Sequence, residues 1–303
     1  MKAISNILLH LNFILVFAVF MGLIFGDYAT HLKGATIYLL GLTMVFSTTG
    51  ISTKSIFPLK KIIQPFIMGT FLNYVIFGIV ILVLAWFLMP TKELFMGFVV
   101  IVAAPPGVAV IPFTGILKGD IEYSIFGVFG AFIASIIIAP ALVAAFSDGS
   151  ISPLSLFVLM VELVLIPMFL SRILLHKRIF PTVAKIRGKV VDWGFAVLIF
   201  IAVGMNRDVF FSDPKILILI SIVLLSATFV IGSLYEFFAS KTTLAKERIT
   251  SQVLLLTIKS SGFSVVTALT LFGKEAAIPS AVLAVIVLLY LLFLSIKMEL
   301  TKK

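Results

Sequence analysis

The chain has no cysteine among its 303 residues, and only 12% of its residues are charged. The lack of cysteine excludes disulfide bonds, thiolate metal sites and cysteine nucleophiles. No long polar stretch interrupts the apolar segments, so these residues leave no room for a soluble catalytic, nucleotide-binding or nucleic-acid-binding domain. Phosphate-binding loops and zinc-binding helices are also missing, and Gly262-Phe263-Ser264-Val265 lacks the strand–turn–helix setting of a hydrolase nucleophile. We therefore expect no enzyme activity, no metal, no cofactor and no nucleic-acid partner.

Hydrophobic residues make up 61% of the sequence, and the mean hydropathy is +1.26. Apolar runs of about 20 residues recur along the chain, and each is long enough to cross a hydrocarbon core of roughly 30 Å. The first run is long and is followed at once by further runs, which argues against a cleaved signal peptide. The composition predicts an all-α protein that is embedded in a lipid bilayer.

Ten membrane-spanning segments can be placed between short polar connections. They cover residues 6–25, 35–51, 62–89, 94–117, 121–146, 151–174, 190–206, 215–238, 248–273 and 276–297.

Lys and Arg residues are distributed unequally between the two ends of these spans. Seventeen of the 23 lie on the side that both termini share, five lie on the opposite side, and Lys259 remains inside a span. Positive charge is retained on the cytoplasmic side of membranes. We therefore predict a protein of the cell (inner) membrane with both termini in the cytoplasm.

The chain divides into two halves at Asp148-Gly149-Ser150, which five spans precede. An odd number of spans inverts the second half relative to the first. We expect two inverted five-helix repeats, residues 1–148 and 149–303, in a single membrane-embedded unit. Spans four and nine are equivalent under this symmetry, and helix-poor residues interrupt both of them near the middle.

These two interruptions are candidates for a ligand site. A Pro-Pro-Gly run removes backbone donors and frees carbonyls, and because lipid cannot satisfy these groups the break must be buried in protein or line a cavity. A simple proline kink is the alternative. The candidate residues are Pro105, Pro106 and Gly107 in span four and Ser260, Ser261 and Gly262 in span nine, together with Thr114 and Thr257 in the same spans.

Lys259 lies beside the second interruption, where a charged side chain costs roughly 2.5 to 3.5 kcal/mol on insertion scales. Desolvation favours the neutral amine, whereas a nearby anion favours the charged form, so Lys259 is a candidate for an anion site linked to a coupling proton. Glu162 in span six is an equally deep acid that could pair with Lys259, unless it faces water or is held neutral. Snorkelling of the lysine is a further alternative. Asn73 in span three is a candidate for the same site or for packing between helices.

Four stretches of the sequence match motifs of one known family. Leu42 to Gly50 is similar to a Met-Phe-x-x-Gly stretch of its helix two, Ala104 to Asp120 aligns with its helix four up to Lys-Gly-Asp, and Ile151 to Arg172 is similar to its helix six. Lys259-Ser260-Ser261-Gly262 stands where this family has Gln-Asn-Ser-Gly. The sequence thus resembles the bile acid:sodium symporter family, whose members carry bile acids and small organic anions such as keto acids. The resemblance implies ten helices in an inverted repeat, with helices 1, 2, 6 and 7 as a panel against a core of the other six. Helices four and nine would cross at their breaks.

The sequence departs from this family at the sodium ligands. Two ligands of helix four fall on Val110 and Ile111, the helix-nine glutamate falls on Leu255, and the helix-nine glutamine falls on Lys259. Aliphatic side chains cannot supply oxygen to a hard cation. Asn73 matches a family glutamine near the second sodium site.

We therefore expect a sodium-independent transporter of a small organic anion, with Lys259 as the substitute cation and proton carrier. The helix halves at Gly107 and Gly262 would offer their amino-terminal dipoles to the carboxylate of the substrate. The alternatives are a sodium-coupled symporter, an auxin-efflux or malonate-type carrier or antiporter of related fold, and a membrane sensor.

Overall fold

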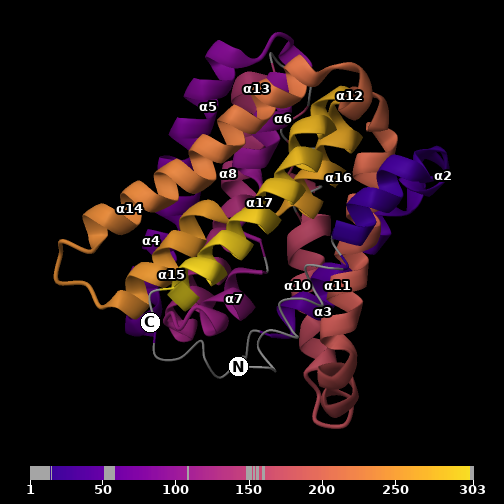
Figure 1. Cartoon of the computed structure of the whole chain (residues 1–303). Coiled ribbons are helices and arrows are strands. Elements are labelled where there is room, and N and C mark those ends of the chain that lie inside the picture. The colour runs from indigo at the N-terminus through magenta and orange to yellow at the C-terminus, as the bar shows by residue number, and fades with distance from the viewer. Residues whose placement is uncertain are drawn as a thin grey trace.

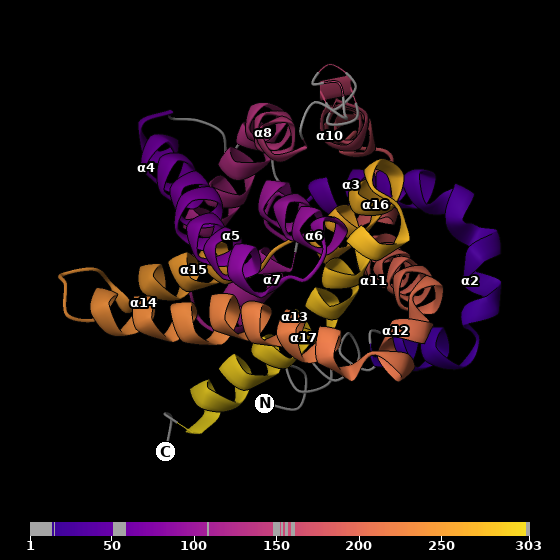
Figure 2. The same cartoon turned by 90° about the horizontal axis from the view of Figure 1, so that it is seen from above.

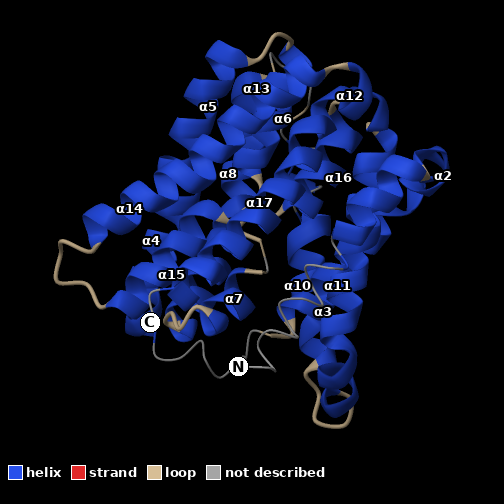
Figure 3. Ribbon diagram, viewed as in Figure 1, coloured by secondary structure: helices blue, strands red, loops and turns tan. Residues whose placement is uncertain are grey.

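The protein is all-helical in its computed structural model, which describes residues 14, 16–50, 59–107, 109–147, 152, 154, 157–158 and 161–300 (Figure 3). Within these residues no strand is formed, and the only extended pairing is an isolated bridge between two helix breaks. The expected all-α class is confirmed.

Among the described residues, five helical segments are long and apolar enough to cross a membrane. They are Ile62–Leu88, Ile121–Phe146, Phe180–Met205, Pro214–Ala239 and Lys274–Met298, and each overlaps one predicted span. The third begins ten residues before the predicted boundary at 190. Hydropathy marks the apolar part of a helix, whereas this helix, α11 (Phe180–Met205), continues through the basic sequence that precedes that part.

Two further predicted spans are each divided into two shorter helices. Span four consists of α6 (Lys92–Ala103) and α7 (Val110–Ile116), and span nine consists of α15 (Lys246–Thr257) and α16 (Ser261–Leu271). Pro105 and Pro106 have no backbone N–H, so helical hydrogen bonding cannot continue through the first interruption. Both interruptions therefore lie at the predicted residues.

The remaining spans are described in part. Span 35–51 corresponds to α3 (Thr36–Thr48), which follows α2 (Gly26–Leu32) and the 3-10 turn η1 (Lys33–Ala35). Span 151–174 ends in η4 (Val161–Leu165) and α10 (Ile166–Leu174). The first half of span 6–25, the start of span 151–174 and the predicted boundary at 148–150 lie outside the described residues.

Among the described residues, three π-helical segments interrupt the helices, and the hydropathy pattern does not predict them. η3 (Phe71–Ile76) joins α4 (Leu59–Thr70) to α5 (Phe77–Leu88), and η5 (Ser226–Val230) joins α13 (Pro214–Leu225) to α14 (Ile231–Ala239). The third is η4. A π-helical turn accommodates an extra residue, and such turns are frequent at functional sites. η3 and η5 lie near the middle of spans three and eight, which are equivalent in the two predicted repeats.

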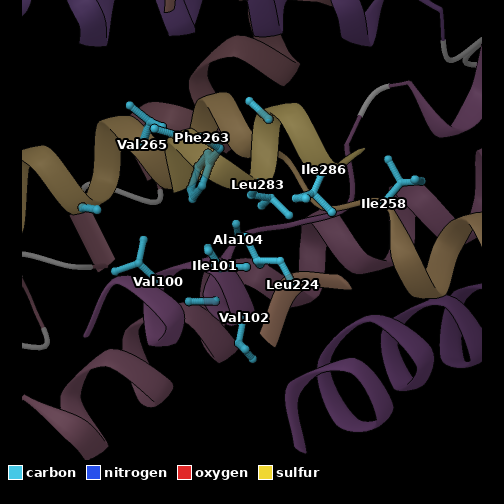
Figure 4. Packing of buried hydrophobic residues seen from close by; sticks show 14 of the residues in the cluster. Val100, Ile101, Val102, Ala104, Leu224, Ile258, Phe263, Val265, Leu283 and Ile286 are labelled. Carbon is cyan, nitrogen blue, oxygen red and sulfur yellow. The ribbon is translucent and has the colours of Figure 1, made fainter. Parts of the chain in front are cut away.

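The broken helices lie in the interior of the molecule. Every residue of α6 from Leu94 to Ala103 is buried, and α15 is buried from Ser251 to Thr257. Figure 2 shows α4, α5 and α14 to the left of α6 and α7, α2, α3 and α11 to the right, and α8 (Ile121–Phe146) above them in the view. Near the breaks, Val102, Ala104, Ile258, Phe263 and Leu283 belong to one buried hydrophobic cluster, in which Ala104 lies near Leu283 (Figure 4). The core thus encloses the candidate site.

The connections between helices lie at the rim of the molecule in Figure 1. The α10–α11 connection lies at the bottom and the α14–α15 connection at the left, whereas the α5–α6 connection and α12 (Arg207–Ser212) lie at the top. The α10–α11 and α14–α15 connections include Lys177, Arg178 and Lys241.

Candidate functional site

The backbones of the two breaks pair with each other. Gly107 N donates to Ile258 O at 2.9 Å, and Ser260 N donates to Pro105 O at 3.1 Å, on either side of an antiparallel bridge between Pro106 and Lys259. A Cβ on Gly107 would lie 3.0 Å from Lys259 O, so a larger residue would press on the backbone of the facing break. The two breaks therefore lie against each other, and because α6 ends at Ala103 while α7 begins only at Val110, the first break is longer than a simple proline kink.

The side chain of Lys259 is enclosed by oxygen atoms. Its exposed fraction is 1%. The ammonium Nζ donates to Asn73 Oδ1 at 2.6 Å, to Val102 O at 2.9 Å and to Ala104 O at 2.5 Å, and Asn73 O lies further away at 3.4 Å. An ammonium has three N–H donors, whereas a neutral amine has two. An ammonium can therefore serve all three short contacts, whereas a neutral amine can serve two of them.

Two aromatic rings complete this enclosure. Nζ lies 4.6 Å from the centroid of the Tyr74 ring and 5.4 Å from that of Phe77, within the range of cation–π attraction. Tyr74 Oη donates to Ala131 O at 3.0 Å, which fixes the ring. We call this set of groups the lysine cage, and it consists of Asn73, Tyr74, Phe77 and the carbonyl groups of Val102 and Ala104.

Helix geometry explains why carbonyl groups are available in the cage. α6 ends at Ala103, and the last carbonyls of a helix have no partner within that helix. The carboxyl-terminal end of a helix also carries partial negative charge, which attracts a cation. Lys259 thus neutralises the end of α6 and satisfies two main-chain oxygens that lipid could not satisfy.

Asn73 connects the cage to the second broken helix. Its Oδ1 accepts from Lys259, and its Nδ2 donates to Leu255 O near the end of α15 at 3.2 Å. Asn73 lies in the π-helical segment η3 and is fully buried. Both the oxygen and the nitrogen of the Asn73 amide therefore bond to span nine, one at the break and the other near the end of α15.

The predicted pair between Lys259 and Glu162 is not formed. Glu162 is exposed in η4, whereas the partners of Lys259 Nζ are uncharged oxygens and aromatic rings. The alternative in which Glu162 faces outward agrees with its exposure. Snorkelling of Lys259 is wrong as well, because the side chain is buried and its nitrogen is held by the cage.

The two predicted threonines lie within the broken helices but not in the cage. Thr114 Oγ1 donates to Val110 O at 2.7 Å and shares a hydrogen bond of 2.8 Å with Ser124 Oγ. Thr257 Oγ1 donates to Val253 O at 2.7 Å. Both hydroxyls are buried, and each is satisfied by the preceding turn of its own helix.

The predicted residues of the second break begin the helix α16. Ser260 Oγ accepts from Phe263 N at 3.4 Å and caps this helix, and Ser261 is its first residue. A Cβ on Gly262 would lie 3.0 Å from the ring of Phe195, so Gly262 allows α16 to pack closely on α11.

The positions of the missing sodium ligands carry aliphatic side chains in the core. Val110 and Leu255 are fully buried, and Ile111 is partly buried. Leu255 contributes its main-chain carbonyl to Asn73, as described above, but no side-chain oxygen.

Four members of the cage were not predicted from the sequence, namely Tyr74, Phe77 and the carbonyls of Val102 and Ala104. Every residue has a main-chain carbonyl, so the residue type does not indicate which carbonyl binds a ligand. The one available signal was the position of Tyr74 and Phe77, one and four residues after Asn73, in a span that already held a candidate residue.

Long apolar helices and two buried half-helix breaks that pair at the core define a membrane protein of the transporter class. The sequence profile of the sodium bile acid symporter family matches residues 36–213, which is more than half of the chain, and the chain belongs to this family. The matched region includes the first break and Asn73 and ends before Lys259. No curated protein sequence gives a significant match.

Proposed function

We propose that this membrane transporter carries a small organic anion, such as a carboxylate or keto acid, without sodium, and that Lys259 takes the place of the coupling cation. The observation that carries the proposal is the position of Lys259 Nζ against the carbonyls at the end of α6 and the amide of Asn73. In transporters with broken helices, half-helix carboxyl-terminal ends and unwound carbonyls are the groups that coordinate cations.

A sodium ion in the same place would meet the ammonium. Two unit charges about 3 Å apart repel by about 5 kcal/mol at an effective dielectric constant of 20. The buried side chains of Val110 and Leu255 add no oxygen that could offset this repulsion. A sodium-independent cycle follows from these two features.

The anion is proposed to bind at the amino-terminal side of the crossing. The helix α16 begins there with Ser260 and Ser261, and the amino-terminal end of a helix attracts negative charge. Because the three N–H groups of Lys259 are already used, the lysine contributes charge to the region and does not contact the substrate directly in this conformation.

A coupling proton is part of the proposal because a lysine, unlike an alkali ion, can lose its charge without leaving the protein. The neutral amine has two N–H donors for three short acceptors, so one oxygen of the cage loses its partner on deprotonation. The conformational equilibrium would then depend on the protonation of Lys259.

The proposed architecture has two inverted repeats, 1–148 and 149–303, with both termini in the cytoplasm of a cell membrane. The breaks in spans four and nine and the π-helical turns in spans three and eight support the repeat. The excess of Lys and Arg on the side of the predicted spans that both termini share supports the orientation.

Uptake of labelled carboxylates into proteoliposomes tests the proposal. We expect uptake to be unchanged when potassium replaces sodium and to increase when a pH gradient is imposed. Thermal unfolding of the purified protein provides the matching binding assay.

Saturable stabilisation by sodium, absent with potassium at equal ionic strength, would instead identify a sodium-coupled symporter, as the family name describes. Saturable carboxylate binding without any uptake would identify a sensor.

A further inference from the structure

The lysine cage has the features of a binding site for a primary ammonium group. Its three short oxygen contacts come from two separate elements, since Asn73 belongs to η3 while Val102 and Ala104 belong to α6 and the residue after it. Lys259 itself comes from the break in span nine. The cage is therefore built entirely from groups outside the segment that supplies the cation.

We propose that the cage recognises a primary ammonium on its own, so that after removal of the Lys259 side chain it binds a small alkylammonium ion in preference to sodium. This inference rests on the proposed function for its biological meaning, but the binding itself is a property of the cage.

The number and geometry of the donors favour a primary ammonium. The contacts of Nζ with Ala104 O, Asn73 Oδ1 and Val102 O are three short N···O contacts, which is the number of N–H groups that a primary ammonium can donate. A tetramethylammonium ion carries the same charge but has no N–H to donate. It therefore separates recognition by hydrogen bonds from attraction by charge alone.

The aromatic rings favour an organic cation over an alkali ion. The faces of Tyr74 and Phe77 lie on Nζ at cation–π distances, and such faces are typical of sites for ammonium ligands. Lys259 is also 1% exposed, so removal of its stem leaves a buried space that an alkyl group can fill. Sodium offers neither hydrogen-bond donors to the oxygens nor an alkyl stem.

Asn73 is the residue that sets the specificity of the cage. It supplies the one side-chain oxygen among the three short contacts, and its Nδ2 bond to Leu255 O fixes the direction of that oxygen. The other two oxygens belong to the main chain and are unaffected by substitution of Val102 or Ala104.

The test uses the full-length Lys259→Ala variant in detergent, with thermal unfolding followed in the chlorides of ethylammonium, tetramethylammonium, sodium and potassium at equal ionic strength. Ethylammonium is short enough to fit beyond the Cβ of the new alanine. We expect a saturable rise in Tm with ethylammonium alone. A rise of the same size in all four salts, or a larger rise in sodium, would overturn the proposal.

Three variants control this experiment. Addition of Asn73→Leu to Lys259→Ala should raise the ethylammonium concentration that gives half of the maximal stabilisation at least about tenfold, as for a lost hydrogen bond to a charged group. Lys259→Met fills the space and should not respond to ethylammonium. Lys297→Ala removes a lysine that pairs with Glu236 outside the cage and should not respond either.

If Lys259→Ala cannot be purified alone, its yield is measured in cultures and buffers with ethylammonium or tetramethylammonium. The proposal requires recovery with ethylammonium only, and a yield that neither ion changes contradicts it. Anion uptake by the ethylammonium-bound variant is measured separately. Stabilisation without restored uptake would leave the cage proposal standing while contradicting the proposed transport role of Lys259.

Discussion

Replacement of Lys259 by methionine is the most direct perturbation of the site, because methionine has a similar reach but no hydrogen to donate. Three buried oxygens would lose their donor, namely Asn73 Oδ1, Val102 O and Ala104 O. Each unsatisfied buried acceptor costs about 1 to 3 kcal/mol.

Removal of the buried charge offsets part of this loss. The insertion cost of a lysine in a membrane is roughly 2.5 to 3.5 kcal/mol, and this cost disappears in the methionine variant. Three acceptors at about 2 kcal/mol each, less about 3 kcal/mol, leave a net destabilisation of about 3 kcal/mol. For a chain of this size we expect a decrease in Tm of roughly 5 to 10 °C.

Thermal unfolding in detergent measures this effect, and Lys297→Met provides the matched control. Lys297 pairs with Glu236 at 2.6 Å, but both side chains are more than a third exposed, so the control should lose no more than about 1 kcal/mol. Equal or greater stability of Lys259→Met relative to the parent protein would refute the reasoning, because the three oxygens would then not need the ammonium.

Three other predictions follow from the structure. Lys259→Arg keeps its charge at any accessible pH, so net pH-driven anion uptake should be lost while exchange across proteoliposomes continues; unchanged net uptake would contradict proton coupling. Gly69→Ala should lower the free energy of unfolding by about 1 to 3 kcal/mol through overpacking, because its Cβ would lie 2.7 Å from Gly127 of α8. In the same thermal unfolding assay Gly41→Ala should be neutral or stabilising, because its Cβ would have no atom within 4 Å. A single cysteine at position 182, in the basic region that begins α11, should react with membrane-impermeant reagents only after the cells are opened; labelling in intact cells would reverse the proposed orientation.

The helical framework and the place of the site could be predicted from the sequence because both depend on residue types. Hydropathy marks where a helix contacts lipid, and prolines mark where backbone hydrogen bonding must stop. This is why the spans and the breaks at Pro105 and Ser260 were placed close to their observed positions. Lys259 was identified because a cation in an apolar segment is conspicuous.

The partners of Lys259 could not be predicted for the same physical reason. The ammonium bonds to main-chain oxygens at Val102 and Ala104, and any residue type provides such an oxygen. Glu162 was a plausible partner because it lies as deep in its predicted span as Lys259 does. The span is almost wholly apolar, so it has no polar face that would indicate where the Glu162 side chain points. The π-helical turn around Asn73 was missed because one extra residue per turn leaves hydropathy unchanged.

The pairing of the two breaks also has a consequence for biosynthesis. The cage joins Ala104 to a lysine that follows it by 155 residues, and the bond from Ser260 N to Pro105 O spans the same interval. When the ribosome has made only the first half, the carbonyls at the end of α6 have no partner, and lipid cannot supply one. The nascent first half must therefore remain sheltered, by the insertion machinery or by its own helices, until the second half emerges and closes the crossing.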